Sequence, residues 1–372
     1  MVEMATIFQR HASQYRARFG DRMPPSHHKV MRAIERCRTP VLGGHVYHCP
    51  DCDQTQYRYH SCRNRHCPKC QNDKALRWLE QQRDLLLPVP YFLVTFTLPR
   101  QLRSLARSHQ KTIYSLLFRS SAGAMRQLAL DDRFVGGQMG FIGILHTWGR
   151  TLSYHPHLHY LVPGGGLDAD DHWRPSRKNF LLPVKALSVI FRAKFRDALR
   201  KAAPELFAGV APEVWEQDWV VHSQPVGDGL AAVRYLAPYI FRVAISNQRI
   251  VRLADGKVTF RYRASDTGRL KTCTLDAQEF IRRFLQHILP KGFVKVRYYG
   301  FFSHGSRQSL AALRQCLNAC LSVDPSGPVV DLARSESPRP QGSVRCPTCN
   351  GPMQRRGRIP PLPRSPPAPA PA

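Results

Sequence analysis

The sequence predicts an α+β fold: a central antiparallel sheet of about five strands, helices packed on one face of it, and a small cysteine-rich module in front. Short runs rich in β-branched and aromatic residues alternate with longer segments whose apolar residues recur every three or four positions, which predicts the sheet and the helices. Five of the 11 cysteines fall between Cys49 and Cys70, which predicts the module. The 372 residues are 43% hydrophobic, enough for a buried core.

We expect four consecutive regions. Residues 1–40 have the pattern of short helices, and residues 41–75 form a module that is too poor in aliphatic residues to fold without a bound metal. Residues 76–310 form the main domain. Residues 311–372 form a helix and then a flexible tail rich in Pro and Arg, because seven prolines fall in the last 13 residues.

The elements of the main domain follow from local patterns. The run YFLVTFTL, bounded by Pro90 and Pro99, predicts a strand, and the pair Asp255-Gly256 between two short apolar runs predicts a hairpin turn. The expected strands cover 91–98, 139–147, 157–162, 219–222, 249–253, 258–263 and 293–299. The expected helices cover 100–130, 184–202, most of 228–245, and 276–289.

The charge of the chain indicates a polyanionic partner. Lys and Arg number 55 against 26 Asp and Glu, which gives a net charge of +29. The basic residues are spread along the whole chain, so DNA or RNA fits better than a membrane surface. No apolar run reaches the length of a membrane span, and the first 20 residues do not resemble a signal peptide, so we expect a cytoplasmic protein.

Two CxxC pairs indicate a structural zinc site. Cys49 and Cys52 form one pair, Cys67 and Cys70 form the other, and 14 residues separate them. Four thiolates satisfy tetrahedral Zn²⁺ and leave no position open, so we expect these four to share one structural ion. Further candidates, which could replace a ligand or serve a second ion, are Cys62, His60 and His66.

A third pair, Cys346 and Cys349, lies alone in the tail. It is either half of a metal site that needs a partner or an unligated pair of thiols.

The run YHPHLH predicts half of a catalytic metal site. On a strand alternate residues share a face, so His157 and His159 point the same way while Leu158 faces the other layer. His146 lies on the preceding strand and is the expected third ligand; three imidazoles leave positions open for water or substrate. We expect His155 at the entry of the strand. The alternative is that these histidines only line a polar sheet face, and the motif alone does not name a reaction.

Two tyrosines lie four residues apart, at Tyr235 and Tyr239. On a regular helix they would share a face, which is most often a packing arrangement. Pro238 lies between them and disfavours helix at Ala237, so the helix either begins near Pro238 or is kinked there.

These motifs occur in an order that carries a resemblance. FTLP at 96–99, HLH at 157–159 and the tyrosine pair resemble the HUH endonucleases (His, hydrophobic, His), which include rolling-circle replication initiators, conjugative relaxases and rolling-circle transposases. Longer runs are similar to the two-tyrosine insertion-sequence transposases among them: YHSCRNRHCPKCQ, HTWGRTLSYHPHLHYLVPGGG, YLAPYIFRVAISNQRI and FIRRFLQHILPKGF. The resemblance covers nearly all of residues 8–310.

The resemblance implies an HUH-type catalytic domain over 76–310 in a transposase with an N-terminal zinc-binding domain. Such an enzyme nicks one strand at a single-stranded DNA element end, joins a tyrosine to the 5′ phosphate and releases a 3′ hydroxyl, without ATP. By this resemblance Tyr235 and Tyr239 are the nucleophiles, and we expect Tyr235 to act first. The resemblance implies Mg²⁺ or Mn²⁺ at His157 and His159, with His146 added by analogy with relaxases.

A phenol has an ordinary pKa near 10, so positive charge from the metal, Arg234 or Arg242 would favour the reactive phenolate. Two other functions fit parts of the pattern. A plasmid rolling-circle replication initiator would use the same nicking step, and a non-catalytic zinc-ribbon protein would bind nucleic acid without cutting it. The N-terminal module and the length of the match favour the transposase.

Overall fold

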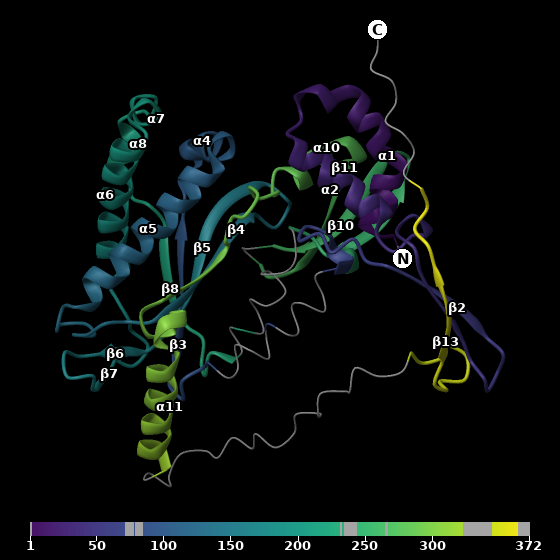
Figure 1. The fold of residues 1–372 in the computed structure, drawn as a ribbon. Helices are drawn as coiled ribbons and strands as arrows, with labels where there is room; N and C mark the ends of the chain where they lie inside the picture. The colour runs from purple at the N-terminus through teal and green to yellow at the C-terminus, as the bar shows by residue number, and fades with distance from the viewer. Residues whose placement is uncertain are drawn as a thin grey trace.

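The computed structural model describes residues 2–70, 78, 85–230, 233, 244–264, 267–322 and 344–363. The expected α+β fold is confirmed, with a five-stranded antiparallel sheet in the order β12-β4-β5-β3-β8 (Figure 1). Its strands are β3 (Tyr91–Thr97), β4 (Phe141–Trp148), β5 (Tyr154–Pro163), β8 (Val221–Pro225) and β12 (Val296–Tyr299). The histidine run therefore lies on the central strand.

One face of this sheet packs on the long helices α5 (Gln110–Ala129) and α6 (Val184–Ala202). Phe96, Leu158 and Tyr160 point into this layer and are fully buried. The predicted helix over 184–202 is confirmed as α6. Short elements flank the layer: η3 (Arg100–Leu102), α4 (Arg103–Ser108), α7 (Pro204–Ala208), α8 (Glu213–Glu216), and the hairpin of β6 (Gly165–Leu167) and β7 (Trp173–Pro175).

The opposite face of the sheet is also covered, so the expectation of helices on one face only was wrong. Leu93 and Ile144 on this face join a second core with Leu310 and Leu317 of α11 (Arg307–Ser322). Buried Val233 joins it too. The turns η5 (Gly300–Phe302) and η6 (His304–Ser306) lead into α11.

A third core gathers the N-terminal helices and a second, smaller sheet. It joins residues of α1 (Met4–Phe19), α2 (Pro25–Arg36) and α10 (Ala277–Leu285) with β9 (Ile250–Ala254) and β10 (Lys257–Arg263). The turns η1 (Gly20–Arg22) and η4 (Asn247–Arg249) belong to the same region. The expected hairpin is confirmed, and a third strand, β11 (Leu270–Asp276), pairs with β10. The pattern missed β11 because most of its side chains are exposed.

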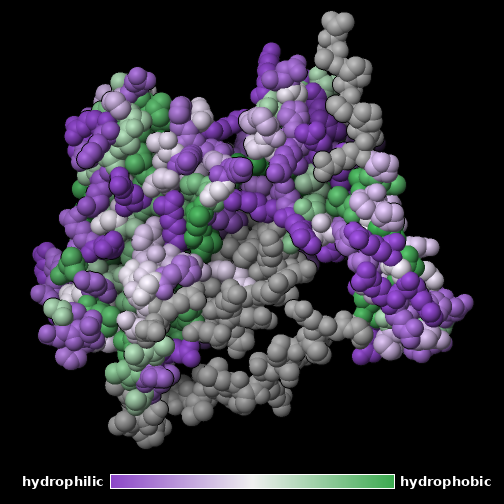
Figure 2. Space-filling view, in the orientation of Figure 1, coloured by the Kyte–Doolittle hydropathy of each residue, from purple (hydrophilic) through white to green (hydrophobic). Residues whose placement is uncertain are grey.

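The cysteine-rich module contains a three-stranded sheet in the order β13-β1-β2. β1 (Gly44–His48) follows η2 (Pro40–Leu42) and pairs with β2 (Thr55–Tyr59) on one side and with β13 (Gln354–Ile359) on the other. The outer surface of this sheet is largely hydrophilic (Figure 2). The expected division into consecutive regions did not include a strand that returns from the C-terminal region. Within the described part of the chain, no helix has both the length and the apolar character that a bilayer crossing requires.

Candidate functional site

Three histidines meet on the sheet face opposite α5 and α6. His146 on β4 lies directly across from His157 on β5, and His159 follows two residues further along β5. One ring nitrogen from each histidine lies within 4.8 Å of the others. The sequence-predicted trio is therefore brought together by the register of a single antiparallel pair.

Hydrogen bonds from neighbouring groups orient two of these rings. The Nδ1 of His157 donates to the carbonyl oxygen of His155 over 2.7 Å, and the Nδ1 of His159 lies 2.9 Å from the Thr95 hydroxyl. When the Nδ1 of a histidine is engaged in this way, its Nε2 is the nitrogen that faces a metal. The ring of His146 stacks on Trp148, with 4.9 Å between centroids.

The histidines of this cluster are neutral at neutral pH. Burial lowers the pKa of His146 and His157 well below the usual value, with a further contribution from the neighbouring histidines, and it lowers the pKa of His159 to about 4. His157 and His159 still keep part of their surface exposed. A neutral imidazole has a free lone pair, so these rings can bind a divalent ion without first losing a proton.

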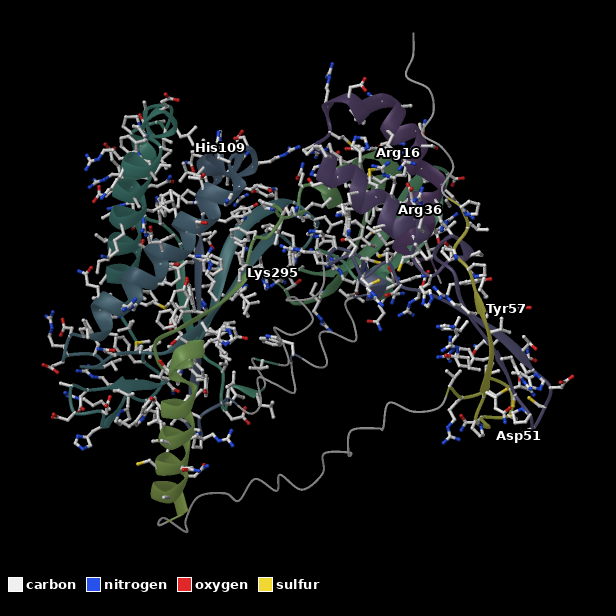
Figure 3. All side chains as sticks on the ribbon, in the orientation of Figure 1. Arg16, Arg36, Asp51, Tyr57, His109 and Lys295 are labelled. Atoms are coloured by element: carbon white, nitrogen blue, oxygen red, sulfur yellow. The ribbon has the colours of Figure 1, made fainter. Side chains whose placement is uncertain are left out.

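Two basic side chains lie near the cluster. The backbone carbonyl of Lys295 accepts a hydrogen bond from the Leu145 amide, which brings this lysine beside His146 in the middle of the molecule (Figure 3). Loss of solvation, and then the charge of Arg65, lowers the pKa of Lys295 to about 7. On the other side, Arg103 of α4 contacts the ring of His155. Such a site attracts an anion such as a phosphate.

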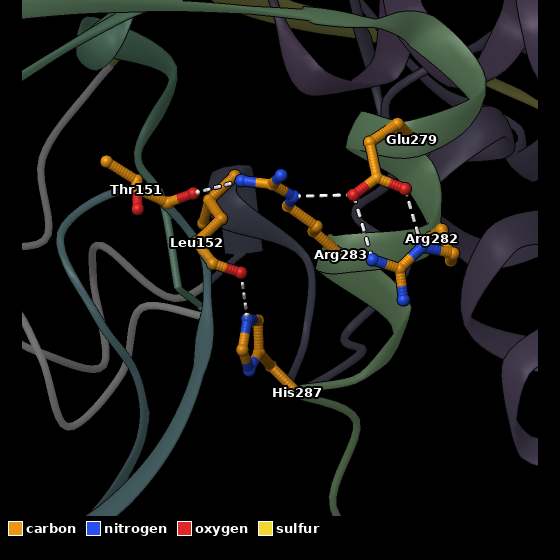
Figure 4. Close-up of polar contacts among 6 residues, drawn as sticks. All are labelled: Thr151, Leu152, Glu279, Arg282, Arg283 and His287. Carbon is orange, nitrogen blue, oxygen red and sulfur yellow. Dashed lines mark hydrogen bonds and ion pairs between the residues drawn. The ribbon is translucent and has the colours of Figure 1, made fainter. Parts of the chain in front are cut away.

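Helix α10 holds the loop between β4 and β5 in place (Figure 4). Arg283 donates to the carbonyl oxygen of Thr151 over 3.1 Å, and Glu279 holds the Arg283 side chain with a bond of 2.7 Å. The Nε2 of His287 donates to the carbonyl oxygen of Leu152 over 3.3 Å. Leu152 has a φ of 62°, a conformation that costs free energy for a residue with a side chain, so the loop needs these contacts.

We expect Arg283→Ala to speed hydrogen exchange at the Gly149 amide, which donates to Ser153 inside this loop. A hydrogen bond from a charged group contributes about 1.5 kcal/mol, so its loss should raise the exchange rate roughly tenfold. Arg282→Ala is the matched control, because Arg282 pairs with the same Glu279 and, among the described residues, its side chain makes no hydrogen bond to the loop. An equal increase in both variants would show that α10 acts through general stability alone.

The cysteines do not group as expected. Cys67 and Cys70 lie with Cys37 and Cys62, and one sulfur from each lies within 4.8 Å of the others. The predicted sharing of one ion with Cys49 and Cys52 is wrong, because β1 and β2 carry that pair to the far end of a hairpin while Cys67 and Cys70 pack in the core with α1 and α2. Cys62 was one of the further candidates; Cys37 was missed because it is a single cysteine outside any motif.

The geometry of this first cluster fits zinc. The Sγ atoms of Cys37 and Cys62 lie 3.3 and 3.5 Å from that of Cys70. Four sulfurs at about 2.3 Å from a tetrahedral zinc are about 3.8 Å apart, whereas a disulfide needs about 2.05 Å. In the described part of the chain His60 and His66 belong to neither cysteine cluster.

The second cluster joins Cys49 and Cys52 to the pair in the tail, Cys346 and Cys349. The tail pair was expected to be either half of a metal site or an unligated pair of thiols. The structure brings it together with a second pair, as the first alternative requires.

Tyr235 and Tyr239 lie outside the described residues, as do Arg234, Pro238 and Arg242. The nearest described residue before Tyr235 is Val233, whose amide donates to the carbonyl oxygen of Gly229 over 2.8 Å. Val233 is fully buried in the core that includes Leu93 and Leu161. Leu161 lies two residues beyond His159, on the same face of β5.

Sequence reasoning missed several residues that position the histidines. Thr95 lies opposite His159 on the neighbouring strand, so its side chain is on the same face of the sheet as the cluster. The alternation of residues along β3 was the signal that could have identified it. Lys295 and His287 lie in segments that pack on β4 from far along the chain, so no local pattern marks them.

Comparisons with known proteins agree with these features. Residues 140–309 match a family model described as "Putative transposase", and residues 7–98 match one described as "Transposase zinc-binding domain". The chain is 39% identical over 370 residues to "Putative transposase y4qJ" of Sinorhizobium fredii, with 94% of this chain and 93% of that protein covered. It is 30% identical over 287 residues to "Transposase for insertion sequence element IS801" of Pseudomonas savastanoi pv. phaseolicola, with 72% and 68% covered. No solved structure matches the chain significantly.

Proposed function

Because the chain belongs to the family of insertion-sequence transposases that includes the IS801 protein, we propose that it nicks and rejoins single-stranded DNA through a 5′-phosphotyrosine, in rolling-circle transposition. In this proposal Tyr235 and Tyr239 are the nucleophiles, and His157, His159 and His146 hold Mg²⁺ or Mn²⁺. Membership of a transposase family implies that the chain binds DNA. The nucleophiles, the ion and the single-stranded substrate are the parts that need a test.

One observation carries the proposal: three neutral imidazoles lie within 4.8 Å of one another, two of them partly exposed, on the sheet face where Val233 is buried. Three ligands leave positions open for phosphate oxygens. Val233 is buried on that face, and Tyr235, the first proposed nucleophile, follows it by two positions in the sequence.

The donor set fits a divalent ion, since all three rings are uncharged and two of them have their Nδ1 engaged. The chemistry that such an ion supplies when bound is polarisation of the scissile phosphate and stabilisation of charge on the departing oxygen. Arg103 and Lys295 flank the cluster and would hold the DNA backbone on either side of it.

The reaction conserves its bond energy. The phenol oxygen of the tyrosine attacks the phosphorus and loses its proton, the bond between phosphorus and the 3′ oxygen breaks, and the 3′ oxygen gains a proton. The new phosphotyrosine is still a phosphodiester, so the 3′ hydroxyl can attack it later and rejoin a strand without ATP. Two tyrosines would let one protein hold two 5′ ends in succession.

The test is a covalent-adduct assay on single-stranded DNA that carries an element end and a label 3′ of the cut, so that the label stays with the 5′ phosphate. We expect labelled protein from the wild type, a strong loss of first-step adduct in Tyr235→Phe, and complete loss in Tyr235→Phe/Tyr239→Phe. Tyr262→Phe on β10 is the control and should leave the yield unchanged. Equal labelling of all four proteins would refute the assignment of the nucleophiles.

A protein that binds this DNA tightly but never becomes labelled, with any divalent ion, would be a binding protein without catalysis. Cutting of a plasmid origin without excision of the flanked element would identify a replication initiator instead. Both outcomes would contradict the proposed transposition chemistry.

A further inference from the structure

Two cysteine pairs from distant parts of the chain meet, and one of them lies outside the family's zinc-binding match. The Sγ of Cys49 lies 3.5 Å from that of Cys349, 300 residues later, and the Sγ of Cys52 lies 3.4 Å from that of Cys346, 294 residues later. All four sulfurs lie within 4.8 Å of one another. The matched zinc-binding region ends at residue 98, so it includes only one of the two pairs.

The two pairs have the same backbone geometry. In the first, the Cys49 amide donates to the carbonyl oxygen of Gln54 over 2.9 Å, and the Asp53 amide donates to the carbonyl oxygen of Cys49 over 3.0 Å. In the second, the Cys346 amide donates to Gly351 over 2.9 Å and the Asn350 amide donates to Cys346 over 3.0 Å.

The fourth residue after the first cysteine also has the same conformation in both turns, with φ of 59° at Asp53 and 60° at Asn350. By contrast, the Cys70 amide donates to Cys67, a tighter turn that the other two pairs lack. Two turns of matching shape that face each other across a small sheet are the arrangement of a zinc ribbon.

The sulfur separations agree with a shared ion. Tetrahedral zinc places its sulfurs about 3.8 Å apart, close to the 3.4 and 3.5 Å seen here, and a disulfide would need about 2.05 Å. The apolar support is slight: only Cys49, Cys346 and Met353 are buried in this cluster, with Tyr47 and Val344 against them. A core this small does not hold a three-stranded sheet by itself, so a metal must supply the missing stability.

We propose that Cys49, Cys52, Cys346 and Cys349 bind a second zinc ion, which fastens the C-terminal strand β13 onto β1. β13 then pairs with β1 along its full length, from Gly44 opposite Ile359 to His48 opposite Gln354 (Figure 1). The zinc module is therefore built from both ends of the chain.

The docked strand completes a basic face. Arg58 and Arg358 both lie opposite His45, and Arg355 lies opposite Tyr47, so these side chains share one side of the sheet. The guanidinium of Arg58 lies 5.9 Å from the centre of the Tyr47 ring. Arginines beside an aromatic ring suit a single DNA strand, through its phosphates and its bases. This role rests on the proposed function, whereas the zinc site does not.

The first experiment counts zinc by elemental analysis in a His157→Ala/His159→Ala background, so that the histidine cluster contributes none. We expect about two zinc ions per chain, about one after adding Cys346→Ser/Cys349→Ser, and about two after adding the control pair Cys273→Ser/Cys316→Ser, which lies outside both clusters. A count that Cys346→Ser/Cys349→Ser leaves unchanged would overturn the proposal.

The second experiment tests the fastening in the full chain with a protease site inserted between residues 323 and 343. After cleavage, the C-terminal fragment should co-elute with the rest of the protein in zinc and separate from it in chelator. Separation in both conditions would overturn the proposal.

The third experiment addresses the DNA face. Arg355→Ala/Arg358→Ala should keep both zinc ions and weaken binding of single-stranded DNA, with a salt dependence shallower by about 1.4 in the log–log slope for two lost phosphate contacts. Unchanged affinity and slope with both zinc ions present would remove the DNA role alone, and this readout requires no cutting.

Discussion

Replacing His157 and His159 together by alanine is expected to slow DNA nicking about a thousandfold or more. Loss of the ion would remove the charge that offsets the departing oxygen, and preorganised electrostatic groups of this kind contribute about 4 kcal/mol to a transition state. Both side chains are partly exposed, so the free energy of unfolding should change little. The measurement is the single-turnover rate of cutting of a labelled single strand, with Mn²⁺ or Mg²⁺ titrated.

His222→Ala is the matched control. His222 is an exposed histidine on β8, and it lies opposite Thr95 on the same face of the same sheet as His159, but it belongs to no cluster among the described residues. We expect its cutting rate and metal dependence to match those of the wild type. If the double variant also cut at the wild-type rate, the histidine cluster would be structural, and the catalytic ion would have to bind elsewhere.

The histidine cluster was predictable because the information that forms it is local. The alternation in HPHLH fixes one face of a strand, and the neighbouring strand follows in sequence, so His146 can reach only a few positions on β5. The centre of the five-stranded sheet was predictable for a similar reason, since β3 and β4 are apolar runs bounded by Pro or Gly. The helix α6 was predicted to the residue because its buried positions repeat without a break.

The cysteine sites were not predictable, because their ligands are fixed by tertiary contacts. Cys37 lies at the end of α2, and it meets Cys70 only once that helix packs on α1. Cys49 meets Cys349 across 300 residues. The CxxC spacing identifies two thiols that can share one ion. It does not identify the other two ligands of that ion. The two nearest CxxC pairs were the obvious partners, and the fold instead gives each a different one.

The contacts that support the β4–β5 loop could not be predicted from the sequence for another reason. Arg283 and His287 lie on and just after an amphipathic helix whose pattern predicts burial of one face. Their contacts with Thr151 and Leu152 depend on how that helix lies against the β4–β5 loop. The exposed edge strand β11 was missed for a related reason, because its side chains show no apolar face to a sequence pattern.

Removal of zinc from the first cysteine cluster is expected to unfold the N-terminal region rather than the five-stranded sheet. Cys37, Cys67 and Cys70 are buried in the same core as Phe8 of α1 and Phe284 of α10. We expect Cys37→Ser/Cys70→Ser to lose one zinc and at least about 4 kcal/mol of stability, a fraction of the 10 to 16 kcal/mol that zinc contributes in small zinc-dependent peptides. For a region of roughly 100 residues, a loss of this size lowers the melting temperature by about 16 °C or more.

Hydrogen exchange measures which part of the protein loses stability. Amides of α1 should exchange fast in Cys37→Ser/Cys70→Ser and in chelator-treated wild type, while amides of α5, which belongs to the other core, should stay protected. Cys346→Ser/Cys349→Ser should leave α1 protected, because that site supports only the small cluster around Met353. Persistent protection of α1 without zinc would mean that apolar packing alone holds the N-terminal helices.

The same variant separates folding from chemistry. Leu152, in the loop between β4 and β5, belongs to the core that contains the cysteines, so melting of that core should also release the loop that positions the histidines. Nicking should then fall together with the protection of α1. In His157→Ala/His159→Ala nicking should fall while α1 stays protected. If zinc loss melted α1 and left cutting intact, the contacts that α10 makes with the loop would not be needed for the histidine site.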